Sequence, residues 1–518
     1  MRNAFAIFIL AAVVWPAASF AKMGESFETS GWIPYWRAER GIANILPQLD
    51  KFTEVNPFVY TVRQDGGLYL NSPLDSEPWT TLRARSRELN IRYIPTVMWA
   101  NPDAMDDVLR DNTKRAAHIA GIVREVYARG FDGIDIDYEA KYAKTRPYFS
   151  QFLNELNEAM GYDKWIMCTI EARTPLESRY SSPESIPADI EYANDFAEIN
   201  KHCDRVRIMA YDQGRLDLKL NDAKGDPYAP VADTDWVEKV MRLTAEDIDK
   251  EKLVIGVATY GYEYDMFAEL ASGQPAAAAA AFGNAGEMRY SRLWSFNPGY
   301  ALDIAAKLGL TPTRNSAGEL SIQYPASQSP DSAIPLSFAT RVMSWSDAGA
   351  IEDKAKLAKE LGLRGVAVFK IDDGQDQGLW GVLAMHRDAS PNASGLAIVP
   401  GAGEKDAVAV ASISTAARPG LAAPSGIAVP LRDLEYGMRN EDVRALQRLL
   451  NEHGFTVAQS GGGSSGNETI FFGPATRTAV AAFQKAHGVS PTAGYFGPKT
   501  RAALQSKVAC AVQQNEVC

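Results

Sequence analysis

Three carboxylates alternate with apolar or aromatic residues within one short segment of the chain. If Gly133–Glu139 is a strand, Asp135, Asp137 and Glu139 all point to the same face. Successive side chains on that face lie about 6–7 Å apart. Like charges buried together at such spacing cannot all stay ionised, so at least one carboxyl keeps its proton. A carboxyl that is protonated near neutral pH is what a general acid requires.

Two other interpretations of Gly133–Glu139 stay open. A solvated acidic edge strand is disfavoured because the carboxylates alternate with buried-type residues. A calcium or magnesium site is possible for clustered carboxylates, but the spacing matches no calcium-binding loop and no histidine accompanies it. We therefore expect proton-transfer chemistry here, with no metal and no cofactor.

Eight apolar runs alternate with helical patterns and provide the elements that would position these carboxylates. Their nearly unbroken apolar character predicts parallel strands buried on both faces, as in a (β/α)8 TIM barrel. A doubly wound open sheet is the alternative. In a barrel, the three carboxylates point inward and Glu139 lies at the carboxyl-terminal mouth. The predicted strands are Ser30–Trp36, Val55–Val62, Ile91–Trp99, Gly133–Glu139, Trp165–Ala172, Arg205–Asp212, Leu253–Gly261 and Gly365–Ile371.

The gap between the last two predicted strands is much longer than the others. It contains three strand-like runs, Met288–Phe296, Glu319–Tyr324 and Thr340–Trp345. This pattern predicts a small α+β insertion at about 265–345, between strands seven and eight, at the end of the barrel where active sites lie.

The N-terminus has the features of a secretory signal peptide over residues 1–21. Arg2 is followed by the apolar core Ala4–Trp15 and by a small-x-small cleavage site at Ser19–Ala21. This core is shorter than the roughly 20 residues that span a bilayer. We expect a protein that is secreted, periplasmic or associated with the cell envelope, with no membrane segment after cleavage.

The rest of the chain divides by composition. A barrel domain over 22–387 is followed by a linker rich in Ala, Pro, Gly and Ser at 388–430, a module at 431–509 and a tail at 510–518. Within the module, Phe472–Ala479 recurs as Phe496–Ala503, and each Gly-Pro precedes a helix start. With an apolar helical stripe ahead of them, these repeats predict three helices.

Charge and cysteines limit the partners and the chemistry. The formal net charge of −11 lacks the basic footprint of a nucleic-acid binder, and we expect a monomer without nucleic-acid partners. Cys168 lies in an apolar run and is expected as a buried small hydrophobe, with pairing to Cys203 as the alternative. Cys510 and Cys518 are close enough in sequence for a bridge in an oxidising compartment.

The acidic segment matches a family pattern. Asp132, Asp135, Asp137 and Glu139 resemble the DxxDxDxE motif of glycoside hydrolase family 18, the chitinase-type barrels, and the motif falls on the predicted fourth strand. The segment Met209–Asp212 is similar to the MxYD motif of that family. With the run from Gly256 to Tyr262 and the insertion, the resemblance covers about residues 28 to 386.

The resemblance implies a substrate-assisted mechanism with net retention. Glu139 would protonate the glycosidic oxygen, and the substrate's own 2-acetamido carbonyl would be the nucleophile. Asp137 would orient the acetamido group, Asp135 would set the protonation of Asp137, and Tyr211 would hydrogen-bond the acetamido group. A carboxylate beside the positive oxazolinium intermediate is physically reasonable.

Seven further residues are implied or expected to bind substrate. Phe369 stands where the family commonly has a Trp under the catalytic subsite, which lowers the expected stacking area; Trp345 and Trp380 are candidate replacements. Aromatic residues near the first two strand ends are either sugar platforms or ordinary packing. The substrate-binding set is Asp132, Met209, Asp212, Tyr35, Phe58, Phe369 and Tyr260.

The C-terminal module also resembles a family. The module is similar to the peptidoglycan-binding domain type 1 in three short segments: Asp442–Leu450, Phe472-Gly-Pro-x-Thr and Ala-Phe483-Gln484. Together, the two resemblances imply a glycosidase that cleaves β-1,4 bonds in polymers containing N-acetylglucosamine, either chitin or peptidoglycan, and is anchored to the cell wall. The alternative is a lectin-like barrel without catalysis, which the intact Glu139 disfavours.

Overall fold

The computed structural model describes residues 27–268, 288–330, 339–388, 429–430, 434, 441–489 and 494–512. The predicted signal peptide lies outside these residues, as do nearly all of the predicted linker and most of the predicted tail. In the ranges described, no helix is long and apolar enough to cross a lipid bilayer.

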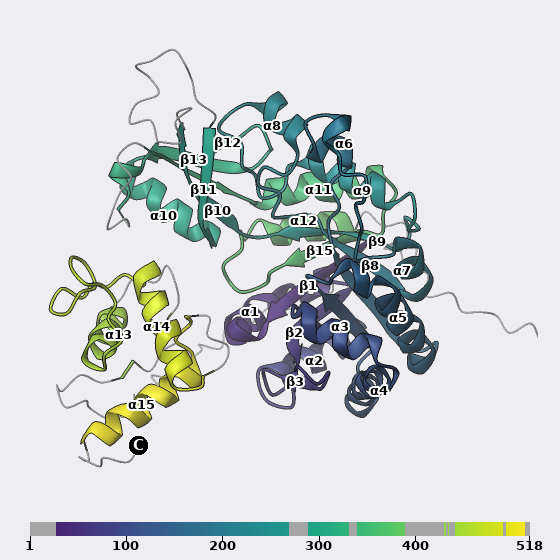
Figure 1. The fold of residues 1–518 in the computed structure, drawn as a ribbon, viewed down its shortest axis with the longest axis horizontal. Coiled ribbons are helices and arrows are strands. Elements are labelled where there is room, and N and C mark those ends of the chain that lie inside the picture. The colour runs from purple at the N-terminus through teal and green to yellow at the C-terminus, as the bar shows by residue number, and fades with distance from the viewer. Residues whose placement is uncertain are drawn as a thin grey trace, which may run out of the picture.

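Eight parallel strands close into a barrel (Figure 1). Neighbouring strands pair in the order β1, β15, β9, β8, β7, β6, β5 and β2, and β2 pairs with β1 to complete the ring. The closed barrel is therefore confirmed, and the open doubly wound sheet is wrong. The strands are β1 (Glu28–Pro34), β2 (Glu54–Val62), β5 (Thr96–Trp99), β6 (Gly133–Tyr138), β7 (Trp165–Glu171), β8 (Arg205–Met209), β9 (Leu253–Ala258) and β15 (Gly365–Phe369), while β3 (Leu68–Leu70) and β4 (Arg92–Tyr93) pair with β2.

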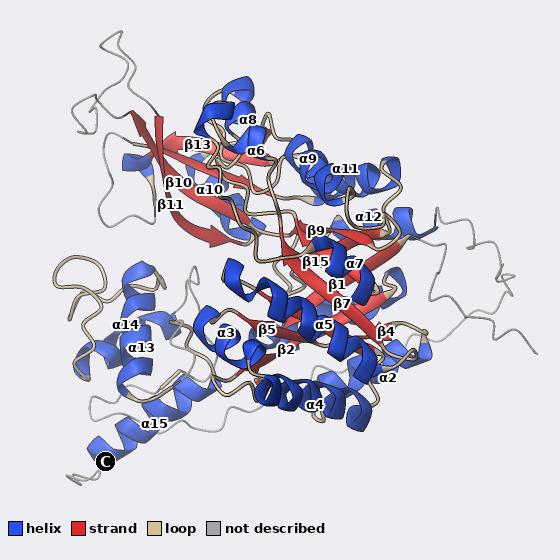
Figure 2. Ribbon diagram, turned by 45° about the vertical axis from the view of Figure 1, so that its right-hand side comes forward, coloured by secondary structure: helices blue, strands red, loops and turns tan. Residues whose placement is uncertain are grey.

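Helices surround the outer face of the barrel (Figure 2). Apolar side chains such as Ile134 and Ile136 belong to the large core, whereas Asp135 between them faces the barrel interior. The helix α4 (Asn112–Arg129) ends at Gly130, which has a left-handed φ of 61°. The helices are α1 (Ala38–Ile45), α2 (Trp79–Glu88), α3 (Pro102–Arg110), α4 (Asn112–Arg129), α5 (Arg146–Met160), α6 (Leu176–Arg179), α7 (Phe196–His202), α8 (Leu218–Lys224), α9 (Thr234–Thr244), α11 (Ala348–Glu360) and α12 (Leu379–Asp388).

The α+β insertion between β9 and β15 is confirmed. It is an antiparallel sheet in the order β11-β10-β14-β13-β12, accompanied by α10 (Pro298–Leu308). The run Leu253–Gly261 is not one strand, because β9 ends at Ala258 and the chain enters β10 at Gly261. The strands of this sheet are β10 (Gly261–Ala268), β11 (Met288–Phe296), β12 (Thr313–Arg314), β13 (Leu320–Pro325) and β14 (Thr340–Trp345).

Three helices form the C-terminal module, as the repeat predicts: α13 (Glu441–Glu452), α14 (Pro474–Ala486) and α15 (Pro498–Val512). The two Phe residues of the repeat, Phe472 and Phe496, are fully buried in the module core.

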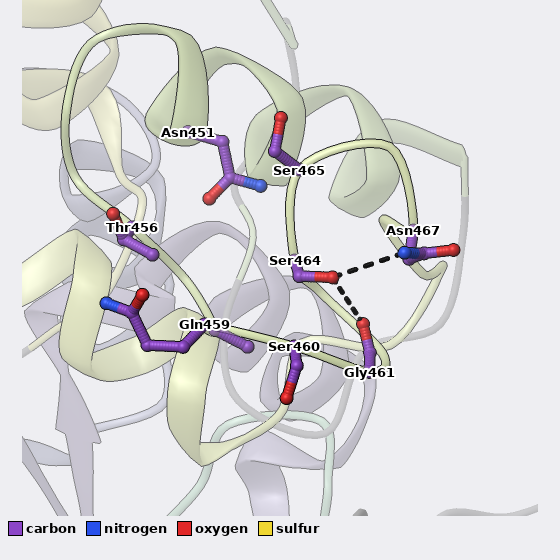
Figure 3. Close-up of a pocket in the computed structure, with 9 residues that line it drawn as sticks. Asn451, Thr456, Gln459, Ser460, Gly461, Ser464, Ser465 and Asn467 are labelled. Carbon is purple, nitrogen blue, oxygen red and sulfur yellow. Dashed lines mark hydrogen bonds between the residues drawn. The ribbon is translucent and has the colours of Figure 1, made fainter.

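The loop between α13 and α14 encloses an open cleft of about 440 Å³ (Figure 3). The cleft has no charged lining residue. It is lined by Asn451, Thr456, Ala458, Gln459, Ser460, Gly461, Ser464, Ser465 and Asn467.

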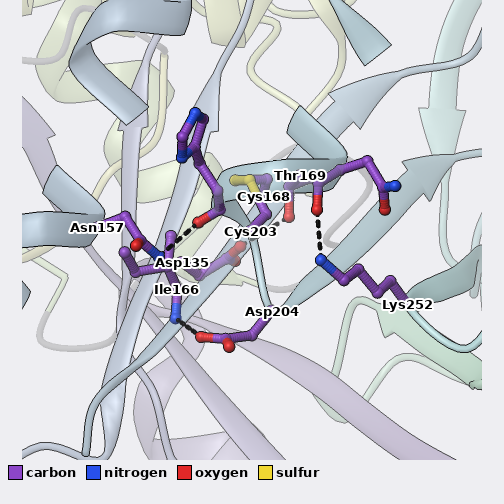
Figure 4. The surroundings of a disulfide bond; sticks show 10 residues. Asp135, Asn157, Ile166, Cys168, Thr169, Cys203, Asp204 and Lys252 are labelled. Atoms are coloured by element: carbon purple, nitrogen blue, oxygen red, sulfur yellow. Dashed lines mark hydrogen bonds between the residues drawn. A yellow bond between two sulfur atoms is a disulfide. The ribbon is translucent and has the colours of Figure 1, made fainter. Parts of the chain in front are cut away.

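A disulfide joins Cys168 of β7 to Cys203, which follows α7 (Figure 4). The expectation of a free, buried Cys168 is therefore wrong, and the alternative pairing is correct. Both residues are buried, and the bond closes a loop of 35 residues on the outer face of the barrel. The short helix α7 places Cys203 directly beside β7. Cys518 lies outside the described residues, as does the side chain of Cys510.

Candidate active site

Asp135 lies at the centre of the barrel interior and is fully buried. Its Oδ2 accepts hydrogen bonds from Trp32 Nε1 at 2.9 Å and from Thr96 Oγ1 at 2.8 Å, and its Oδ1 accepts one from Thr169 Oγ1 at 2.8 Å. Burial raises the pKa of Asp135 to about 6, and these three donors oppose that shift. Because the donors come from three different strands, the carboxyl is held in one orientation.

Arg207 is the cation below the acidic strand. Its Nη1 lies 3.0 Å from Asp135 Oδ2, and its guanidinium also pairs with Glu54. Burial lowers the pKa of Arg207 to about 9, so the side chain remains charged at neutral pH. A second buried pair, Glu28 with Arg205 at 2.7 Å, lies nearer the amino-terminal end of the strands. The lower interior is therefore a network of paired charges.

Asp137 is buried two residues further along β6. Its Oδ1 has no hydrogen-bond partner among the described residues. Burial, followed by the charges of Glu139 and Asp135, raises the pKa of Asp137 well above its usual value, while Lys141 opposes the shift. A buried acceptor without a donor is costly in a folded protein, and a bound ligand with an N–H group would satisfy it.

Glu139 lies just beyond the end of β6 and is half-buried. Burial is the largest cause that raises its pKa; the carboxylates of Glu171 and Asp212 add to it, and Lys141 opposes it. The carboxyl therefore combines partial access from the barrel mouth with a tendency to hold its proton, which are the two properties of a general acid.

Aromatic rings surround Phe369 at the mouth. Tyr211 stacks on it with ring centroids 6.0 Å apart, and Trp32, Phe58 and Tyr260 meet its ring edge-on at 6.0–6.3 Å. Phe369 is half-buried and remains partly accessible. The structure therefore places an apolar floor beside the carboxylates.

The other predicted side chains near this floor come from two loops. Tyr35 follows β1 and packs edge-on against Trp36 with centroids 5.0 Å apart. Asp212 follows β8 with φ of 60°. Its Oδ1 accepts hydrogen bonds from Tyr260 Oη at 2.5 Å and Tyr262 Oη at 2.8 Å. The strained backbone of Asp212 is thus secured by two hydroxyls.

Two residues of the MxYD segment lie at the end of β8. Met209 is half-buried and pairs in register with Glu171 of β7. Burial, followed by the neighbouring carboxylates of Asp137 and Asp212, raises the pKa of Tyr211 well above its usual value. The Tyr211 hydroxyl therefore keeps its proton and can donate a hydrogen bond to a substrate.

Three candidate residues are not brought to this site. Asp132 is exposed at the amino-terminal end of β6, where its Oδ2 accepts a hydrogen bond from the backbone N–H of Tyr93 at 2.7 Å. Trp345 is buried in the core of the insertion, and Trp380 packs on Phe52 from α12. Asp132 supports the start of the strand, and neither Trp replaces the missing floor residue.

Three further residues at or below the site were missed by sequence reasoning: Lys141, Glu171 and Arg207. Glu171 and Arg207 occupy inward positions of their strands, which is a detectable pattern once the barrel register is known. Lys141 carries no such pattern, because its position depends on a turn after Glu139. Among the described residues, no group of three or more His, Cys, Asp or Glu side chains could hold a metal ion.

Comparison with known proteins identifies the barrel. The model of "Glycosyl hydrolases family 18" matches residues 31–374, about two thirds of the chain. The chain belongs to this family. A second match, "Putative peptidoglycan binding domain", covers residues 439–504. A family 18 barrel is therefore joined in one chain to a module that matches the putative peptidoglycan-binding family.

Two curated relatives illustrate the similarity within family 18. The cortical fragment-lytic enzyme of Bacillus subtilis is 25% identical over 308 residues, which cover 58% of this chain and 62% of that protein. The uncharacterized glycosylase YvbX of the same organism is 23% identical over 164 residues, 32% of this chain and 43% of that one. The chain thus spans less than two thirds of the curated relatives it matches.

Solved structures share the barrel fold. The spore cortex-lytic enzyme SleL of Bacillus cereus superposes with a TM-score of 0.52 at 17% identity, covering 70% of this chain and 74% of that chain. A chitinase from Chromobacterium violaceum gives a TM-score of 0.52 at 18% identity, covering 70% and 99%. At such identities the likeness concerns the fold alone.

Proposed function

We propose that this protein is an exported family 18 glycosidase that hydrolyses β-1,4 bonds next to N-acetylglucosamine in peptidoglycan, with chitin as the second candidate substrate. The observation that carries the proposal is the combination of two carboxyl groups, those of Asp137 and Glu139, in different environments. One is a buried carboxyl whose Oδ1 lacks a donor, and the other is a half-buried carboxyl with a raised pKa at the barrel mouth.

The proposed mechanism uses the substrate's own 2-acetamido group. Its carbonyl oxygen attacks the anomeric carbon while Glu139 gives its proton to the leaving glycosidic oxygen. Asp137 Oδ1 accepts the acetamido N–H and stabilises the positive oxazolinium, and the Tyr211 hydroxyl donates to the acetamido oxygen. Ionised Glu139 then removes a proton from water. This water attacks the anomeric carbon and opens the oxazolinium, so that the anomeric configuration is retained overall.

Binding of the sugar would rest on the floor around Phe369. Tyr211, Tyr260 and Phe58 extend this ring, and Asp212 is hydrogen-bonded to Tyr260 at its edge. Met209, at the end of β8, is proposed to line the same subsite. Phe369 presents less stacking area than a Trp, so Tyr211 stacked beside it supplies part of the missing aromatic surface.

The choice of peptidoglycan rests on the C-terminal module and on relatives whose names refer to spore cortex lysis. We propose that the neutral cleft of the module contacts the wall polymer through hydrogen bonds. In this scheme residues 1–21 direct export, 22–387 are the enzyme, 388–430 are a tether, 431–509 hold the wall and 510–518 are a tail. The Cys168–Cys203 disulfide supports an oxidising destination.

The test compares wild type with Glu139→Gln on purified peptidoglycan and on chitin oligosaccharides, with products examined by mass spectrometry. Loss of the general acid should slow turnover about 1000-fold while the fold is retained. Glu158→Gln, an exposed change on α5, is the matched control and should act like wild type. A wild type that binds but cleaves neither polymer is a lectin-like protein, and equal turnover by Glu139→Gln contradicts the assigned acid.

A further inference from the structure

The chain turns sharply after Glu139. Ala140 has a φ of 57°, in the left-handed region that residues with a side chain rarely occupy. Its backbone N–H donates to Glu171 Oε1 at 2.9 Å, and Glu171 Oε2 accepts a hydrogen bond from Asn194 Nδ2 at 2.9 Å. Glu171, from the end of the neighbouring strand, therefore holds the turn that follows the proposed acid.

This turn directs Lys141 into the protein. The Lys141 side chain is fully buried, and its amine donates to the backbone oxygen of Tyr138, the last residue of β6. The same amine lies 3.7 Å from Glu171 Oε2 and 4.7 Å from the centre of the Phe149 ring. A cation with no access to solvent has no route to a bound sugar, so any role in the reaction must act through another group.

The charged groups that face Glu139 come from every neighbouring element. Asp137 precedes it on β6, Glu171 lies at the end of β7, and Asp212 follows β8. Lys141 is the cation that opposes these carboxylates in the effects on both Asp137 and Glu139. Burial lowers the pKa of Lys141, while the surrounding carboxylates favour its charged form.

We propose that Lys141 and Glu171 are positioning residues, an opposed pair of charges that sets the proton affinity of Glu139. Alone, the amine would favour ionised Glu139 and remove the acid near neutral pH. The carboxylate of Glu171 alone would hold the proton too firmly for transfer. Together the two charges nearly cancel, so that Glu139 can act as acid and then as base.

This proposal rests on the proposed function, and its test is the basic limb of the pH profile of kcat/KM, which reports the acid in the free enzyme. Lys141→Met should move that limb about one pH unit upward, and Glu171→Gln about one pH unit downward. The double variant should return close to wild type. Gln at 171 can still accept the Ala140 N–H, and Asn194 Oδ1, which has no partner within the described part of the chain, can accept from its amide.

Lys144→Met is the matched control, because Lys144 is exposed and pairs with Asp106 of α3. The basic limb of its pH profile should coincide with that of wild type. A second measurement does not require turnover: the Glu139 carboxyl signal, assigned by its loss in Glu139→Gln, is titrated by ¹³C NMR in each variant. Opposite shifts in the two single variants support the opposed pair. Shifts in the same direction, or lower rates with unmoved titration, overturn it. An inactive wild type would contradict the proposed function, and the titration would still decide this inference.

Discussion

The barrel site and the cleft of the C-terminal module differ in the charge of the side chains that form them. From the mouth down into the barrel interior, carboxylates and cations from several strands are buried together, and their pKa values are displaced from the usual range. The module cleft is lined only by neutral residues, from the end of α13 and the loop that follows it.

Under the proposed function, the barrel transfers protons and the module holds a polymer, and the difference between the two regions fits these tasks. Moving a proton requires carboxyls whose ionisation is set by burial and by fixed neighbours, and such groups cost stability unless they are paired. Holding a polymer requires only donors and acceptors that water can replace. Substitutions at the mouth should therefore affect stability and pH dependence strongly, whereas substitutions in the cleft should affect retention on the wall and little else.

The largest stability effect is expected at Arg207. Arg207→Met leaves Asp135 and Glu54 buried without this cation and should lower the free energy of unfolding by about 4 kcal/mol. Urea unfolding followed by Trp fluorescence measures this in the full chain, because every Trp lies at or before residue 380. The exposed Arg85→Met is the control and should change stability by less than about 0.5 kcal/mol. A similar loss of stability in Arg207→Met and Arg85→Met would contradict the expected difference between the buried and the exposed arginine.

The second effect is a pH dependence at His118, which is buried behind β6 beside the Tyr138 hydroxyl and Gly66 O. Burial lowers its pKa to about 4 from 6.5, so the unfolded chain binds more protons between these values. Stability is full above pH 6.5 and falls by about 3 kcal/mol as the pH decreases to 4. His118→Gln can keep both hydrogen bonds and should flatten this part of the stability curve. The same slope in both proteins would contradict the assignment.

The smallest effect is expected in the cleft. Gln459→Ala combined with Ser460→Ala removes two neutral hydrogen-bonding groups and should weaken retention on purified cell wall about three- to tenfold. Turnover of soluble oligosaccharides should not change. Thr478→Ala, an exposed change on α14, is the control for binding. Unchanged retention with the double variant would place the wall contact elsewhere on the module.

Much of the scaffold is predictable from periodicity alone. All eight barrel strands overlap the predicted runs, because residues buried on both faces leave an unbroken apolar pattern. The pattern failed where backbone geometry decides: the run Leu253–Gly261 looks continuous, but β9 ends at Ala258 and β10 begins a different sheet. Cys168 was misjudged because its partner Cys203 lies 35 residues further along the chain, just after α7.

The site was predictable to the extent that it lies on one strand. Alternation placed Asp135, Asp137 and Glu139 on one face, and the structure brings them together inside the barrel. The place of Lys141 in the site could not be predicted, because the direction of its side chain depends on the left-handed backbone of Ala140, which no spacing rule predicts. Asp132 belongs to the same motif but lies at the far end of the strand, which shows that a shared motif does not mean a shared location.

The free energy of unfolding of the barrel depends on whether Cys168 and Cys203 are oxidised to a disulfide or reduced. Closing a 35-residue loop constrains the unfolded chain by about 3–4 kcal/mol, and this contribution exists only when the thiols are oxidised. A chain kept in a reducing compartment would therefore have the lower free energy of unfolding. If the protein is exported as proposed, the disulfide adds this free energy of unfolding only once the chain has reached an oxidising compartment.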